Sequence, residues 1–128
     1  MSTGIQLRRV HGRYGVARLA PNAPIPSWID GPGLTALVRA EDELTVVCAV
    51  DRIPEHVKLD APWVCVRSIG PFDFQMTGIV RSLVAPLSEA GISVFVLCTF
   101  DGEHLLVAER DADKAFAVLV EAGHRLEP

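Results

Sequence analysis

The chain has 128 residues, of which 49% are hydrophobic and 22% charged, and its formal net charge is −4. This composition is typical of one or two small folded domains and excludes a disordered chain. The basic residues are few and scattered, so we expect no nucleic-acid partner, and no apolar run is long enough to cross a membrane. The N-terminus lacks the basic and apolar segments of a secretory signal, which favours a cytoplasmic location.

The N-terminal half is rich in short β-strand patterns. Its predicted elements are strands over 5–10 and 14–19 joined by a turn at 11–13, a proline-rich segment over 21–26, a hairpin formed by 34–40 and 44–50, and a loop over 51–62. The prolines exclude a regular helix or a paired strand, whereas the hairpin has valine- and threonine-rich strands around an acidic turn. We therefore predict a β-rich region over residues 1–61, followed by a second region over 62–128.

One amphipathic helix and one buried strand organise the second region. Apolar residues recur from Met76 to Leu87 at the i, i+3, i+4 spacing of a helix with one apolar face. Asp73 precedes this pattern and can cap the first turn, and Gly91 is suited to ending the helix in a left-handed conformation. The apolar run over 92–98 then predicts a central strand.

The remaining elements complete a known arrangement. They are strands over 63–69, 104–108 and 124–126, a tight turn at Asp101-Gly102, and a second helix that Asp111 can cap and Gly123 ends. The order strand, helix, strand, strand, helix, strand, with short connections and right-handed crossovers, predicts an α+β, ferredoxin-like βαββαβ sheet. Both helices should cover the same face.

Pro86 falls in the interior of the first predicted helix. Proline has no backbone N–H, so it cannot donate a hydrogen bond to the Ser82 carbonyl, and its ring crowds the preceding turn. We expect a kink that wraps the helix around a twisted sheet.

The sequence contains no recognisable catalytic or metal-binding constellation. Cys48, Cys65 and Cys98 lie in apolar, strand-like stretches without the close spacing of a zinc site, so we expect buried, reduced thiols. His104 follows Cys98 closely, but the sequence does not show whether the two side chains face each other. We predict no catalytic residue, no metal and no cofactor.

Several short segments of the second region resemble a known family. They are Gly70-Pro71-Phe72-Asp73-Phe74, Thr77-Gly78-Ile79, Ala85-Pro86-Leu87, Glu89-Ala90-Gly91-Ile92-Ser93 and Cys98-Thr99-Phe100-Asp101. Through these segments the sequence resembles an ACT domain of the small bacterial tandem-ACT type, similar to the cytosolic arginine sensor family. Residues 1–61 resemble the family more weakly and read as a degenerate ACT-like half; the sequence leaves open whether they are a true repeat.

The resemblance implies a regulatory module that binds a small molecule, most simply an amino acid, and that pairs as a homodimer. ACT domains commonly associate side by side and hold ligands at the seam, near the loop between the first strand and helix. The ligand-binding positions implied for this chain are Asp73, Phe74, Met76, Ser93, Val94, Thr99, Phe100 and Glu103.

Because the sequence departs from the family pattern at two positions, the identity of the ligand stays open. The arginine sensor has an acidic residue where this chain has Met76, and a shorter acid where it has Glu103. Because a buried cation needs close pairing, losing one carboxylate weakens the case for a guanidinium ligand. A neutral amino acid is one alternative. The other is a structural or protein-interaction ACT dimer without a ligand, in which Asp73 only caps a helix and Phe100 is core.

Overall fold

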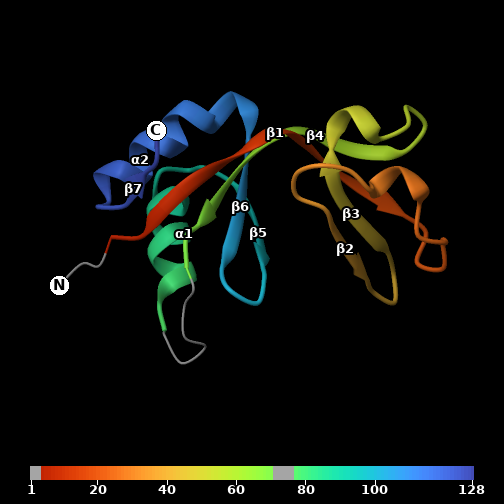
Figure 1. The fold of residues 1–128 in the computed structure, drawn as a ribbon, viewed down its shortest axis with the longest axis horizontal. Coiled ribbons are helices and arrows are strands. Elements are labelled where there is room, and N and C mark those ends of the chain that lie inside the picture. Colours follow the sequence, from red (N-terminus) through yellow and green to blue (C-terminus); the bar gives the residue numbers. More distant parts are fainter. Residues whose placement is uncertain (1–3, 71–76) are drawn as a thin grey trace. The chain divides into compact units, whose positions relative to one another are not determined.

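The computed structural model describes residues 4–70 and 77–128. The chain divides into two compact units: unit 1 comprises Met1–Val10 with Val64–Pro128, and unit 2 comprises His11–Trp63. Two long strands, β1 (Gln6–Leu19) and β4 (Lys58–Ser68), each contribute residues to both units and can be followed in Figure 1. Residues 4–10 thus belong with the C-terminal region and not with the remainder of the predicted β-rich half.

Unit 2 is built around the hairpin of β2 (Ala36–Arg39) and β3 (Leu44–Ala49), which confirms the hairpin predicted there. β3 pairs antiparallel with β2 on one side and with β1 on the other. Two short 3₁₀ helices, η1 (Ser27–Ile29) and η2 (Val50–Arg52), flank these strands. The buried core of the unit is formed by Ala17, Ile29, Leu44, Val46, Cys48 and Ile53.

Two local predictions in the N-terminal half were wrong. The turn expected at 11–13 is absent, because β1 continues through it as one strand of 14 residues. Gly12 has φ 109°, a conformation open to glycine, so the backbone can bend there without ending the strand. The loop expected over 51–62 is also shorter, since β4 begins at Lys58. The first residues of β4 are exposed, and Pro62, of a residue type that sequence patterns assign to loops or strand edges, lies within the strand.

Unit 1 contains the predicted ferredoxin-like α+β arrangement, which is confirmed. Its elements after β4 are α1 (Ile79–Glu89), β5 (Val94–Cys98), β6 (Glu103–Ala108), the 3₁₀ turn η3 (Glu109–Asp111), α2 (Ala112–Glu121) and β7 (Arg125–Leu126). The structure adds one strand that was not predicted in this sheet. The first residues of β1 pair in parallel with β7, and Ile69 donates a backbone hydrogen bond to the Gln6 carbonyl, so β1 lies between β7 and β4.

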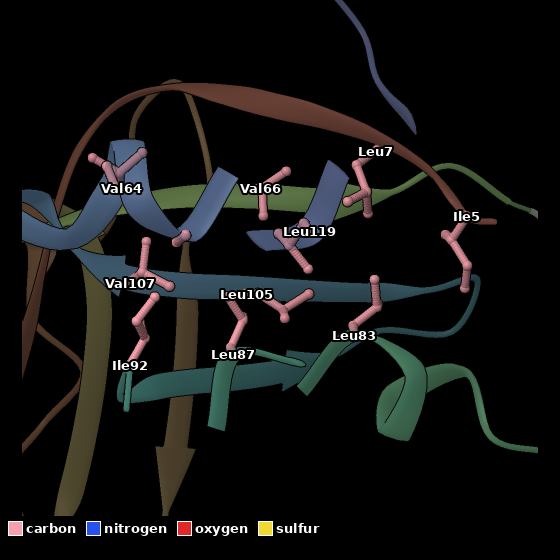
Figure 2. Close-up of a cluster of buried hydrophobic side chains, with 12 residues drawn as sticks. Ile5, Leu7, Val64, Val66, Leu83, Leu87, Ile92, Leu105, Val107 and Leu119 are labelled. Atoms are coloured by element: carbon pink, nitrogen blue, oxygen red, sulfur yellow. The ribbon is translucent and has the colours of Figure 1, made fainter. Parts of the chain in front are cut away.

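Both helices of unit 1 cover the same face of its sheet. Leu83 and Leu87 of α1 and Leu119 of α2 are almost fully buried, and they share one apolar cluster with alternate residues of the strands. Figure 2 shows these side chains gathered over β4 and β6. The remaining buried members of the cluster are Ile5, Leu7, Val64, Val66, Ile92, Leu105, Val107, Ala112 and Ala115. Burial of each large aliphatic side chain stabilises the unit by about 1.5–3 kcal/mol.

The two helices end in the same way. Gly91 has φ 77° and follows α1; its N–H donates to the Ser88 carbonyl, and the next N–H, of Ile92, donates to the Leu87 carbonyl. Gly123 closes α2 with the equivalent pair of hydrogen bonds. This is the Schellman pattern predicted from the glycines. Asp111 does precede α2, but its side chain makes no capping hydrogen bond, contrary to expectation.

The Ser82 carbonyl, to which Pro86 cannot donate a hydrogen bond, finds its partner outside α1. Pro86 lies inside α1, so the Ser82 carbonyl receives no N–H from it. The Nε2 atom of His124 lies 2.9 Å from that carbonyl oxygen, and its Nδ1 atom accepts a hydrogen bond from the Ile5 N–H at 3.1 Å. A neutral imidazole protonated on Nε2 satisfies both contacts. His124 therefore joins α1 to the first residues of the chain.

Candidate functional site

The most structured polar group among the predicted ligand positions is the carboxylate of Glu103. Glu103 is the first residue of β6, and its Oε2 atom lies 2.9 Å from the Oγ atom of Ser68, the last residue of the neighbouring strand β4. The Glu103 N–H in turn donates to the same Oγ atom at 2.9 Å. Ser68 is completely buried, whereas Glu103 is partly exposed. The carboxylate is therefore held at one point and still reaches the surface.

Thr99 and Phe100 lie in the turn that joins β5 to β6. Both the N–H and the hydroxyl of Thr99 donate to the Gly102 carbonyl, at 2.7 and 3.2 Å, which closes the tight turn predicted at Asp101-Gly102. Phe100 is 78% exposed at the tip, so its assignment to the core is excluded. We refer to Ser68, Thr99, Phe100, Gly102 and Glu103 together as the Glu103 corner.

Glu103 lines a hollow together with apolar side chains of α1 and the sheet. This small surface hollow lies between the first turns of α1 and strands β5 and β6. It is lined by Val80, Leu83, Val84, Val96, Glu103 and Leu105. Glu103 contributes the only ionisable side chain among these described residues. The corner therefore places one negative charge at the edge of an apolar surface.

Ser93 and Val94 lie at the opposite end of β5 from the Glu103 corner. Val94 is paired with Val107, whereas Cys98, at the other end of β5, is paired with Glu103. The two pairs are four residue steps apart along the strand, which corresponds to about 13 Å. A single chain does not bring the two groups of predicted ligand residues together.

Three predicted ligand positions, Asp73, Phe74 and Met76, lie outside the described residues. α1 begins at Ile79, and Val80 in its first turn lines the hollow together with Glu103. Where those three side chains lie therefore stays a prediction.

Ser68 is the residue of this corner that sequence reasoning missed. It stands in the apolar strand predicted over 63–69, at a position where the alternation places Val64 and Val66 on the buried face. A small hydroxyl residue on the buried face of a strand requires a hydrogen-bond partner. That requirement was the available signal, although it could not name Glu103 as the partner.

His104 and Cys98 do not form a catalytic pair. Neighbouring residues of a strand point to opposite faces, so His104, which follows Glu103, lies on the face away from Cys98. Burial, with a smaller effect of the Arg67 charge, lowers the pKa of His104. Its Nδ1 atom is buried and has no hydrogen-bond partner within residues 4–70 and 77–128. The same ranges contain no cluster of three side chains suited to a metal ion.

The sequence profile of the ACT domain matches residues 58–121, which is half of the chain. The chain belongs to the ACT domain family. A second profile, described as an N-terminal domain, matches residues 12–56. The ACT match begins with β4 and ends with α2, so it includes both Ser68 and Glu103.

Solved structures and a human relative extend this assignment. The ACT chain is 47% identical to an Agrobacterium tumefaciens protein of known crystal structure, covering 98% of this chain and 94% of that one with a TM-score of 0.93. It is 12% identical to E. coli aspartokinase III in complex with aspartate and ADP, covering 91% of this chain and 32% of that one with a TM-score of 0.61, which shows a shared fold.

The human protein CASTOR3P is 37% identical over 65 residues. This alignment covers 44% of the ACT chain and 40% of the human protein, so the chain spans less than half of that relative. In the described part of the ACT chain, neither helix has the length and apolar character that a membrane crossing requires.

Proposed function

We propose that this ACT protein is a regulatory module that binds an amino acid where two ACT domains meet. The observation that carries the proposal is the Glu103 carboxylate, which belongs to the ACT-matched segment and is held by Ser68 beside the first turns of α1. Regulatory amino-acid binding is what membership of this family favours.

The corner offers complementary chemistry for both charged ends of an amino acid. The α-ammonium group suits the Glu103 carboxylate, because charge-assisted hydrogen bonds are stronger than neutral ones. The α-carboxylate suits the first N–H groups of α1, which have no partner within the helix and lie at its positive end. The Phe100 ring, exposed at the turn, can cover the bound molecule.

A second copy of the chain would complete the site. β5 is the last strand in the sheet order, so within the described residues its outer edge has no partner strand. Antiparallel pairing of two β5 strands would place the start of one strand, at Ser93 and Val94, beside the end of the other, at Thr99. Such a homodimer unites the two groups of predicted ligand residues.

A ligand-free structural or protein-interaction dimer is the second candidate. It is favoured by the internal pairing of the corner, since Ser68 already binds the Glu103 carboxylate and Gly102 already accepts the Thr99 hydroxyl hydrogen bond. Polar groups satisfied in this way do not need a ligand.

A thermal-shift screen against the standard amino acids, followed by calorimetry of each hit, tests the proposal. A ligand present at a hundred times its Kd stabilises the folded state by about 2.7 kcal/mol, which corresponds to a rise of several degrees in Tm. The D-enantiomer of each hit is the matched control and should give a much smaller rise. A screen in which no amino acid raises the Tm, on a protein that is dimeric, contradicts the sensor and favours the ligand-free dimer.

A further inference from the structure

Ser68 and Glu103 form a closed pair in which each residue both donates and accepts. The Ser68 Oγ atom accepts the Glu103 N–H at 2.9 Å and lies 2.9 Å from Oε2 and 3.4 Å from the carbonyl oxygen of the same residue. A hydroxyl has one proton, so the shorter contact, to Oε2, is the one that carries it. The main chain and the side chain of Glu103 are thus bound by one buried atom.

This pair fixes the direction of the Glu103 side chain. A glutamate at the partly exposed start of a strand otherwise samples many rotamers, and ordering such a side chain costs up to about 2 kcal/mol. Ser68 is completely buried in β4, so its own position is set by the strand and the packed core around Val66. Ser68 binds Oε2 and leaves Oε1 outside the pair.

We propose that Ser68 is a positioning residue that presents the Glu103 carboxylate to the protonated amine of the ligand, and so makes the site selective for ligands that carry that amine. The inference rests on the proposed function and adds the residue that sets its charge preference. Val80, Val84 and Val96 line the same hollow as Glu103, and their side chains offer no polar partner, so the Glu103 carboxylate supplies the charge there that distinguishes a protonated amine from an uncharged analogue.

The experiment compares each amino acid that binds with its 2-hydroxy acid, which keeps the carboxylate and the side chain but lacks the ammonium group. Calorimetry on the full chain gives the ratio of the two Kd values. For the wild type we expect a ratio of about tenfold or more in favour of the amino acid. Ser68→Ala and Glu103→Gln should each reduce the ratio to about threefold or less, with the Kd of the hydroxy acid nearly unchanged.

Ser82→Ala is the matched control. The Ser82 hydroxyl donates to the Ile79 carbonyl within α1, at 2.8 Å, and does not touch Glu103. This variant should keep the wild-type ratio. Ser68→Cys, which preserves the shape of the side chain but donates a weaker hydrogen bond, should give an intermediate ratio and replaces Ser68→Ala if the alanine variant does not fold.

The outcomes separate this inference from the proposed function. A wild type that binds no amino acid contradicts the proposed function and this inference with it. A wild type that binds an amino acid, while Ser68→Ala or Ser68→Cys keeps the full ratio, contradicts this inference alone. A lower Tm in these variants with an unchanged ratio would show that the pair only supports the fold.

Discussion

At the scale of single residues, the three thiols of this ACT protein differ in their surroundings. Cys48 and Cys65 are fully buried, and burial is the main cause that raises the pKa of both thiols. For Cys65 the pKa rises from 9.0 to about 12, because the apolar interior disfavours the thiolate. Cys98 is exposed at the end of β5. The expected buried thiols are therefore found at two of the three positions.

The pKa of Cys65 predicts a loss of stability in alkaline solution. Its folded pKa of about 12 lies above the ordinary value of 9.0, so the folded state retains the proton longer than the unfolded chain does. The stabilisation is complete below pH 9.0 and is lost as the pH rises toward about 12. The free energy of unfolding, from urea titrations, should fall by up to about 1.4 kcal/mol per pH unit from this group.

Cys65→Ala serves as the control because alanine does not titrate. The variant has a lower stability at neutral pH from the lost side-chain contacts, but its stability should decline less steeply above pH 9.0. Parallel curves for the two proteins would show that Cys65 titrates normally.

At the scale of elements, the position of α1 depends on a histidine that belongs to the segment after α2. His124 replaces the hydrogen bond that Pro86 denies to the Ser82 carbonyl, and it also accepts the Ile5 N–H. The residue is only 5% exposed, so both groups would remain unpaired if the imidazole were removed.

His124→Phe should lower the free energy of unfolding by about 2–4 kcal/mol, since two buried backbone groups lose their partners. Pro86→Ala supplies a new N–H for the Ser82 carbonyl. In that background His124→Phe should therefore cost about 1 kcal/mol less. Urea denaturation of the two single variants and the double variant measures this coupling. His56→Phe, at an exposed histidine, should have little effect. If the effects of Pro86→Ala and His124→Phe on the free energy of unfolding are strictly additive, His124 does not substitute for the missing N–H of residue 86 at the Ser82 carbonyl.

At the scale of the whole molecule, the outer edge of β5, which pairs with no other strand of residues 4–70 and 77–128, predicts association. The Thr99 N–H donates to the Gly102 carbonyl, so these two residues form a hydrogen-bonded pair of the β5–β6 ladder. Such pairs alternate with non-hydrogen-bonded pairs in an antiparallel sheet. The next pair, Cys98 and Glu103, is therefore a non-hydrogen-bonded pair. The Cys98 N–H consequently points away from β6, to the outer edge of the sheet.

Cys98→Pro should weaken a dimer that forms along β5. Proline removes the outward N–H and is tolerated at a sheet edge, so the fold should persist. Sedimentation velocity should give about twice the chain mass of 13.9 kDa for the wild type and a shift toward 13.9 kDa for the variant. Cys98→Ala keeps the N–H and should sediment like the wild type. A wild-type monomer, or a dimer unaffected by Cys98→Pro, would contradict association through this edge.

Local sequence patterns predicted α1, β3, β6 and the C-terminal glycines of both helices, because spacing, turn residues and left-handed glycines act over only a few positions. They failed where the local signal was weak. Gly12 was read as part of a turn although β1 continues through it, and the exposed, proline-containing start of β4 was read as loop.

The sequence by itself therefore determined the order βαββαβ, the apolar faces of both helices and the membership of the ACT family. Only the tertiary structure decided which distant residues meet. It placed Ser68 against Glu103, 35 positions away, joined His124 to Ser82, 42 positions away, and inserted β1 beside β7. Periodicity shows which face of an element is buried, but the partner of a buried polar group depends on which elements the fold brings side by side.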